Sequence, residues 1–138
     1  MSAPDFLDSN ILIYAYDSSA PQKQATARDL VRQALAGSGV ISSQVLAELC
    51  ATLLHKASRK TPPQQVNAIL DALGSIRLMA LSGEIVRRAV EAYATYGIHF
   101  YDGMIVAAAE KAGCERIWSE DLNSGQKYFG VTVENPFL

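Results

Sequence analysis

The chain has 138 residues, a length typical of one domain of ~100 to 200 residues, so we expect residues 1–138 to form a single domain. Apolar residues make up 49% and charged residues 19%, a composition that indicates a folded globular protein and excludes a disordered chain. The apolar runs are far shorter than the ~18 residues of a membrane-spanning helix, and the first residues lack the pattern of a secretory leader. We therefore expect a cytoplasmic protein without a membrane partner.

The net charge of −2 argues weakly against a protein that coats nucleic acid through a positive surface. If four of the 14 acidic residues gather at one metal site, however, the remaining surface would be net positive. The two cysteines are too few for a disulfide scaffold and lack the spacing of zinc ligands. We expect Cys50 and Cys114 to be small buried apolar side chains.

Short apolar runs alternate with helical patterns along the chain. In chain order we predict a strand ending at residues 6–8, a short apolar element at 11–16, a helix at 21–36, a strand at 40–42, a helix at 43–58, a helix running from a capping box at 61–64 to about 73, a strand at 76–81, helices at 83–96 and 102–112, a strand at 116–119 and an edge strand at 131–133. This alternation predicts an α/β fold in which helices cover both faces of a mostly parallel sheet of four to five short strands.

Two acidic residues stand at the ends of predicted strands. Asp8 ends the first strand and Asp121 follows the fourth, which is where sheets of this class place their ligand sites. The structural alternative for Asp8 is a turn or helix cap leading into Asn10. The alternative for Asp121 is an ordinary polar loop.

Two further acids lie on predicted helices. Asp102 shares a helix face with Ile105 and Val106, so its carboxylate should face the interior. An interior carboxylate must cap the helix, bind a proton or meet a cation, and capping is the structural alternative. Glu48 lies at the edge of an apolar helix stripe, where the alternative is simple solvation.

All four acids fall near strand ends or on helices that begin beside them, so they can converge on one cleft. Carboxylates crowded together repel one another and would be partly protonated without a counter-ion. A hard divalent cation resolves this conflict, and oxygen ligands without Cys or a His pair favour Mg²⁺, with Mn²⁺ as a substitute. Such a cation can activate water for attack on a phosphodiester.

Four segments, in this order, resemble the motif blocks of PIN-domain ribonucleases. The segments are Phe6 to Tyr14, Ser42 to Leu49, Tyr101 to Ala109, and Trp118 to Leu122. Two C-terminal stretches, 121–126 and 135–137, look like those of VapC-type toxins of bacterial type II toxin–antitoxin pairs.

The resemblance implies a PIN-like three-layer sandwich and a Mg²⁺-dependent endoribonuclease that cleaves RNA by metal-activated water. Its catalytic and metal-binding acids would be Asp8, Glu48, Asp102 and Asp121, with Asn10 and Ser119 in support. Gly103 stands where the family often has Ala. This change loosens the start of the helix by up to ~1 kcal/mol but removes no ligand.

Basic residues outside the blocks could hold the RNA. Lys56, Arg59 and Lys60 form a cluster that could grip phosphates, with Arg87 and Arg88 elsewhere, although ordinary solvated side chains are an equal alternative. Two histidines are tempting bases but stand outside the motif blocks. We expect His99 to be structural and His55 to lie on the surface or line a groove.

Two other functions compete with the nuclease. A catalytically inactive interaction module could use the same fold, but all four acids are intact. A haloacid-dehalogenase-like phosphatase needs a second carboxylate two residues after Asp8, where Asn10 stands. The resemblance also implies a cognate antitoxin and a homodimer, whose surface could come from the helices around Leu30 and Leu53.

Overall fold

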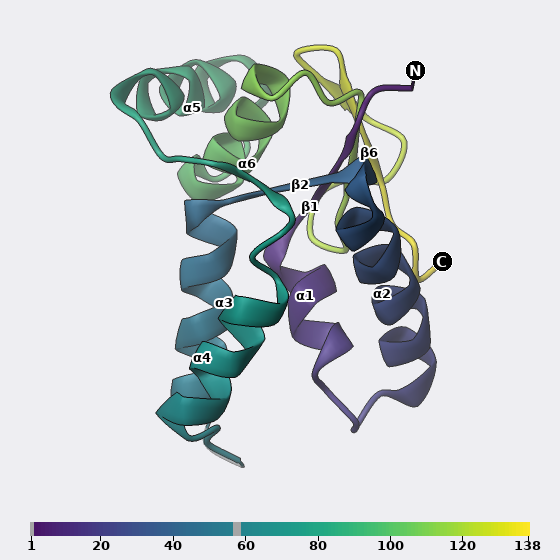
Figure 1. Cartoon of the computed structure of the whole chain (residues 1–138). Helices are drawn as coiled ribbons and strands as arrows, with labels where there is room; N and C mark the ends of the chain where they lie inside the picture. The colour runs from purple at the N-terminus through teal and green to yellow at the C-terminus, as the bar shows by residue number, and fades with distance from the viewer. Residues whose placement is uncertain (1, 57–58) are drawn as a thin grey trace.

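The computed structural model describes residues 2–56 and 59–138, which form an α/β fold around a central sheet (Figure 1). The elements are β1 (Asp5–Leu7), α1 (Ser9–Ala15), α2 (Pro21–Gln33), the π-helical turn η1 (Ala34–Ser38), β2 (Gly39–Ser42), α3 (Ser43–His55), α4 (Pro63–Ala72), β3 (Arg77–Met79), α5 (Gly83–Tyr96), α6 (Phe100–Lys111), β4 (Arg116–Trp118), β5 (Lys127–Tyr128) and β6 (Val131–Glu134).

The sheet has the strand order β3-β2-β1-β4-β6-β5, and only the β5–β6 pair is antiparallel. The prediction of a mostly parallel sheet is confirmed. The sheet has six strands rather than four to five, because the two-residue β5 is too short to leave a pattern in the sequence. The last predicted strand is therefore not an edge strand, since β5 pairs along its outer side.

Helices pack in pairs around this sheet, with α5 against α6, α1 against α2 and α3 against α4. Figure 1 shows α5 and α6 together at the upper left, α3 and α4 at the lower left, and α1 and α2 at the lower right. The predicted bounds of α5 match the structure. The predicted capping box at Thr61 is wrong: Pro62 is the N-cap and makes no side-chain hydrogen bond. Because Pro63 follows, Pro62 is held extended and the helix starts after it.

Two other helices end earlier than predicted. α2 ends at Gln33 and passes into the π-helical turn, which closes at Gly37 with a φ of 111° that favours glycine. α3 ends at His55, and the last two positions of its prediction lie outside the described residues.

The core lies between the sheet and its helices. Strand β2 is buried along its whole length, and α6 is buried from Gly103 to Ala109. Cys114 is buried as predicted, but Cys50 is only half-buried. Of the two residues around which a dimer surface was expected, Leu53 on α3 is half-buried, and Leu30 is buried on a face of α2 that meets the core. That face packs on the core because α2 lies directly against α1.

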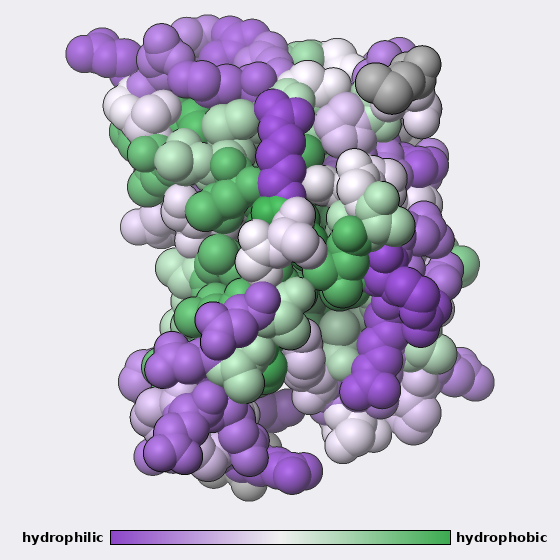
Figure 2. All heavy atoms as spheres, in the orientation of Figure 1, coloured by the Kyte–Doolittle hydropathy of each residue, from purple (hydrophilic) through white to green (hydrophobic). Residues whose placement is uncertain are grey.

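Large apolar side chains nevertheless reach the surface. Figure 2 shows them gathered across the middle of the face seen in Figure 1, with hydrophilic side chains above and below. The exposed residues include Leu78 and Leu81 around the end of β3, and Val90 and Tyr93 on α5. In the described parts of the chain, no helix is both long and apolar enough to cross a membrane.

Gly103 is required by the close approach of α5 to α6. A Cβ atom at this position would lie 2.9 Å from the backbone oxygen of Ala89 and 3.3 Å from the Cβ of Ala92. The glycine therefore does more than loosen the helix start, because α5 could not pack as closely against an alanine.

We predict that Gly103→Ala destabilises the protein, although alanine is the better helix former. Overpacking costs about 1–3 kcal/mol and the gain in helix propensity is at most about 1 kcal/mol, so the net loss should reach about 2 kcal/mol. Urea unfolding measures this change. Gly83→Ala is the matched control, because a Cβ atom there meets nothing within 4 Å. Equal stability of the two variants would contradict the packing argument.

Candidate active site

The backbone brings the ends of β1 and β4 together. The Asp8 amide donates a hydrogen bond to the Trp118 carbonyl at 3.0 Å, and the Ser119 amide donates to the Glu134 carbonyl at 3.0 Å. These bonds continue the parallel ladders by one residue beyond the strands. The side chains of Asp8 and Ser119 therefore start from fixed neighbouring positions at the carboxyl edge of the sheet.

Asp8 is almost fully buried, with 3% of its surface exposed. Its Oδ1 accepts a hydrogen bond from the Ser9 amide at 2.7 Å and so caps α1. Its Oδ2 accepts from the Ser119 hydroxyl at 2.7 Å. The structural alternative of a helix cap is thus correct for Asp8, but it uses only one oxygen and leaves the other facing the end of β4.

Asn10 lies between the carboxylates of Asp8 and Asp121. Its Nδ2 donates to Asp121 Oδ2 at 3.2 Å and lies 3.5 Å from Asp8 Oδ2. Its Oδ1 accepts from the Glu120 amide at 3.2 Å. The Ser119 hydroxyl accepts from the Asp121 amide at 3.1 Å. Asn10 and Ser119, the two predicted supporting residues, therefore connect two acids that lie on different elements.

Glu48 and Asp102 approach the same edge from helices. Ser42 ends β2 and caps α3, and Glu48 stands in the second turn of that helix. Asp102 lies in the first turn of α6, whose N-cap is His99. The Nδ1 atom of His99 accepts from the Tyr101 amide at 3.2 Å, so the capping alternative for Asp102 is wrong and the structural role predicted for His99 is confirmed.

The electrostatics show that the four acids form one group. Burial raises the pKa of Asp8 to about 6, although hydrogen bonds from Ser119 and Ser9 oppose the rise; the charges of Asp121 and Glu48 add to it. Loss of water raises the pKa of Glu48, and the charges of Asp102 and Asp121 raise it further. Burial and the charge of Asp121 also raise the pKa of Asp102.

The donor chemistry of this group fits a hard divalent cation. Every candidate ligand is a carboxylate oxygen, and among residues 2–56 and 59–138 none of the four acids forms an ion pair with a basic side chain. As they stand, however, no three His, Cys, Asp or Glu side chains of the described residues are arranged to hold a metal ion. The Asn10 amide lies between two of the acids, so metal binding would require side chains to turn.

Two residues that lie near the acids, Ser9 and Glu120, were not identified from the sequence. The Ser9 hydroxyl lies within hydrogen-bonding reach of Glu48 and lowers its pKa. Glu120 points away from the acids, where its Oε1 accepts from Lys23 Nζ at 3.1 Å and from the Tyr14 hydroxyl at 3.2 Å. This pair anchors the segment between Ser119 and Asp121 to α1 and α2. In the sequence, the signal for Glu120 was its place between Ser119 and Asp121, because successive residues that continue a strand point to opposite sides.

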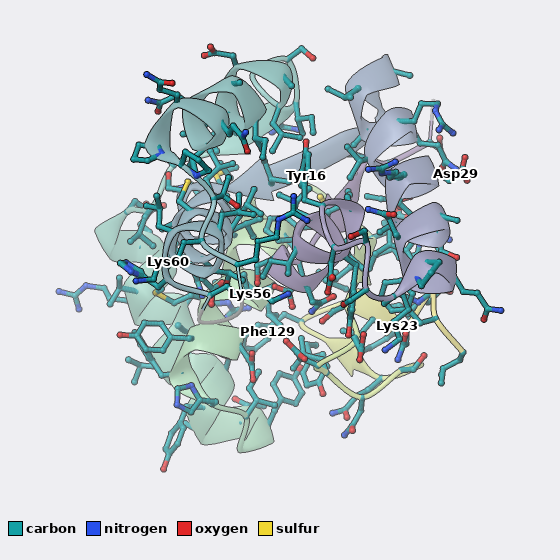
Figure 3. The ribbon with its side chains drawn as sticks, turned by 90° about the horizontal axis from the view of Figure 1, so that it is seen from below. Tyr16, Lys23, Asp29, Lys56, Lys60 and Phe129 are labelled. Atoms are coloured by element: carbon teal, nitrogen blue, oxygen red, sulfur yellow. The ribbon has the colours of Figure 1, made fainter. Side chains whose placement is uncertain are left out.

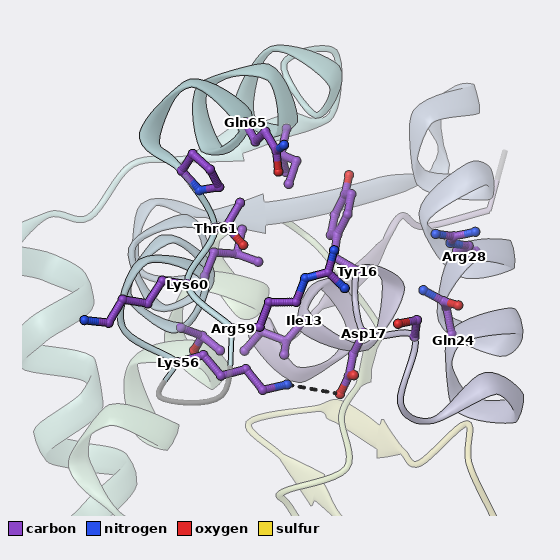
Figure 4. A pocket seen from close by; sticks show the side chains of 15 residues that line it. Ile13, Tyr16, Asp17, Gln24, Arg28, Lys56, Arg59, Lys60, Thr61 and Gln65 are labelled. Atoms are coloured by element: carbon purple, nitrogen blue, oxygen red, sulfur yellow. Dashed lines mark ion pairs between the residues drawn. The ribbon is translucent and has the colours of Figure 1, made fainter.

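The predicted RNA-binding cluster lines a separate cavity. Lys56, Arg59 and Lys60 border a space of about 450 Å³ between α1, α2, α3 and the start of α4. Figure 3 shows Lys56 and Lys60 on one side of α1 and Lys23 on the other. In Figure 4, Arg59 reaches toward Tyr16, whereas the amino group of Lys60 points away from the cavity.

This cavity lies along α1, which Asp8 caps, and α3, which carries Glu48. At one end, Ser9 of α1 meets Glu48 of α3. At the other, Asp17, just beyond α1, pairs with Lys56, just beyond α3, at 3.7 Å (Figure 4). The cluster is therefore about two helical turns from the acids and makes no hydrogen bond or ion pair with them among the described residues.

Among residues 2–56 and 59–138, Arg87, Arg88 and His55 form no hydrogen bond or ion pair with the four acids. Arg88 pairs with Glu110 of α6 at 2.8 Å and with Glu91 of α5 at 2.6 Å, so its guanidinium is held by these two helices. Arg87 and His55 are exposed, which agrees with the solvated alternative for Arg87 and with the surface position expected for His55.

We predict that Asp8→Asn stabilises the metal-free protein above about pH 6. The folded state holds its Asp8 proton up to a pKa of about 6, whereas the unfolded chain releases it near 3.8. Wild-type stability should therefore fall as pH rises through this window, by up to about 3 kcal/mol, and the asparagine variant escapes this loss. Urea unfolding in EDTA at about pH 4 and about pH 7 measures the difference. Asp29→Asn, an exposed acid on α2, is the control, and equal behaviour of both variants would contradict the prediction.

Comparisons with known proteins agree with this architecture. A chain of a toxin–antitoxin complex from Klebsiella pneumoniae is similar over 98% of both chains, with 22% identity and a TM-score of 0.66. DNA-bound VapBC from Salmonella typhimurium matches 98% of this chain and 99% of that chain, with 18% identity and a TM-score of 0.69. VapC20 of Mycobacterium tuberculosis, described as a sarcin-ricin loop cleaving toxin, matches 85% of this chain and 91% of its own, with 17% identity and a TM-score of 0.63.

At these identities the solved structures show a shared fold. The comparison with curated proteins finds no match. The sequence profile of the PIN domain family matches residues 6–128, which include all four acids and both supporting residues. Because this match covers most of the chain, the chain belongs to the PIN domain family.

Proposed function

We propose that the chain is a Mg²⁺-dependent endoribonuclease that acts in the cytoplasm as the toxin of a toxin–antitoxin pair. The observation that carries the proposal is the convergence of four carboxylates at one edge of the sheet without a basic partner among the described residues. The similarity of the fold to VapC20, a toxin described as cleaving the sarcin-ricin loop, supports RNA as the substrate.

The acids have distinct roles in this proposal. Asp8 is the central ligand, because its burial and two short hydrogen bonds hold its carboxylate in one orientation. Asp102 and Asp121 complete the ligand set or hold its waters, and Glu48 orients the attacking water or holds a second ion. Bound Mg²⁺ would activate water and neutralise charge on the phosphate. No side-chain nucleophile is needed.

Neutral hydrogen bonds position these acids. The Ser119 hydroxyl donates a hydrogen bond to Asp8 Oδ2 and accepts one from the Asp121 amide, so one side chain positions two acids. Asn10 holds Asp121 beside Asp8. Serine and asparagine can do this without adding a positive charge that would compete with the metal.

Lys56, Arg59 and Lys60 are proposed to hold RNA phosphates away from the cleaved bond. Their cavity lies along α1 and α3, the helices that also carry Ser9 and Glu48. Phosphate contacts of this kind fix the position of the RNA but read no sequence. Asp17 already neutralises part of the Lys56 charge.

A catalytically inactive interaction module is the second candidate function. The cap that Asp8 forms on α1 favours it, because this contact alone gives one acid a structural reason to exist. The other three acids have no such role, and the cost of crowding them favours the nuclease. Cleavage experiments separate the two.

The proposed partners are a cognate antitoxin and a second copy of the chain. Two of the similar structures, from Klebsiella pneumoniae and Salmonella typhimurium, are complexes of a toxin with its antitoxin. With Leu30 buried, the homodimer would use half-buried Leu53 or apolar side chains that the structure leaves exposed.

We predict that the protein cleaves RNA with Mg²⁺ or Mn²⁺ and that EDTA stops the reaction. Asp8→Asn and Asp121→Asn should abolish cleavage, and Ser119→Ala should slow it about 10- to 100-fold, the usual effect of losing a residue that orients a ligand. A fluorescence-quenched RNA measures the rates, with Asp29→Asn as the control that keeps activity. Metal-independent cleavage would contradict the proposed mechanism.

We also predict that the product of the neighbouring open reading frame copurifies with this chain and blocks its RNA cleavage. A segment that covers the four acids would need a basic side chain to match their charge. Coexpression followed by a cleavage assay with and without this product makes the test. If the product neither binds nor inhibits, the toxin role is wrong although the nuclease can stand.

A further inference from the structure

An apolar hollow lies directly beside the four acids. It has a volume of about 360 Å³, within the range of small-ligand pockets. Its lining residues are Gln44, Ala47, Glu48, Leu81, Tyr101 and Met104. Glu48 belongs both to this wall and to the acid group, so whatever fills the hollow lies next to the reacting phosphate of the proposed function.

Tyr101 presents an exposed aromatic ring at this hollow. Its side chain is 56% exposed, and it immediately precedes Asp102 in the first turn of α6. The His99 ring stacks against it, with centroids 5.7 Å apart and an angle of 24° between the planes. Within the described residues the Tyr101 hydroxyl makes no hydrogen bond, so local polar contacts do not explain the residue.

The main chain at Tyr101 is held in place by a side chain of α3. The Gln44 side-chain amide donates to the Tyr101 carbonyl at 3.1 Å. Gln44 also lies close enough to Glu48 to lower the pKa of that carboxyl group. One side chain thus connects the aromatic wall of the hollow to the acids.

We propose that this hollow binds one nucleobase of the RNA substrate, next to the cleaved phosphodiester, by stacking on Tyr101. This inference rests on the proposed function and adds a base-binding subsite to it. Unpaired bases in RNA loops and single strands stack on exposed aromatic rings, and every base has a face that can do so. The apolar side chains of Leu81 and Met104 would shield the base from water, and Gln44 would meet its polar edge.

The charge in the wall favours a base over a protein partner. An apolar surface from a second copy of the chain would cover the Glu48 carboxylate and remove its water, which is costly for an ion without a basic partner. A base covers the apolar side chains while its polar edge and the RNA backbone stay hydrated.

The test pairs a side-chain deletion with a base deletion. Wild-type and Tyr101→Ala proteins are assayed on an RNA that the wild type cleaves. They are also assayed on two variants of this RNA, each with a single abasic nucleotide, one before and one after the cleaved bond. We expect Tyr101→Ala to raise KM about 5- to 150-fold on the intact RNA, the loss measured for one stacked base, and Tyr101→Phe to recover most of it. On the abasic RNA that lacks the stacked base, wild type and Tyr101→Ala should be equal.

Tyr93→Ala is the matched control, because Tyr93 is 62% exposed on α5 and lies outside the hollow. Binding of the same RNAs to Asp8→Asn and Asp8→Asn/Tyr101→Ala proteins, followed by fluorescence anisotropy, reads the contact without cleavage. If wild type cleaves no RNA, the proposed function fails and this binding comparison decides the stacking. Equal losses for Tyr101→Ala on intact and abasic RNA overturn the inference. It is also overturned if the Tyr101→Ala protein sediments as a smaller species than wild type, which would assign the hollow to a second copy of the chain.

Discussion

The site depends on carboxylates that are held close together although their charges repel. Asp8 is the centre of this arrangement, buried at the end of β1 and bound by the hydroxyl of Ser119 and the amide of Ser9. These donors are neutral, so they hold the carboxylate without cancelling its charge. The repulsion between the carboxylates therefore remains, and it favours the binding of a cation that would relieve it.

Parallel strands make this arrangement possible. Their carboxyl ends meet at one edge of the sheet, and the helices that follow them start there. β1 and β4 are neighbours, so Asp8 and Ser119 are adjacent although 111 residues separate them. Glu48 and Asp102 then enter from the early turns of α3 and α6. The close contact of α6 with α5 at Gly103 belongs to the same geometry, because it fixes the helix turn that carries Asp102.

Much of this could be read from residue patterns. Alternating strands and helices predicted the parallel sheet, and the positions of Asp8 and Asp121 after strands predicted their place at its edge. The capping box at Thr61 failed because the effect of two consecutive prolines outweighed the hydroxyl pattern. The choice between the helices of Leu30 and Leu53 as a dimer surface could not be made from sequence, because an apolar helix face looks the same whether it meets a partner or, as at Leu30, the core.

The amino-acid sequence by itself determined the α/β class, the order of the main elements and the placement of four acids near strand ends, because these follow from periodicity and from residue types near strand ends. Only the tertiary structure decided that Asn10 bridges Asp8 to Asp121, that His99 rather than Asp102 caps α6, and that Tyr101 opens onto a hollow beside Glu48. The bridge and the hollow join side chains from elements far apart in the chain, and the cap depends on where α6 begins. None of the three leaves a local pattern in the sequence.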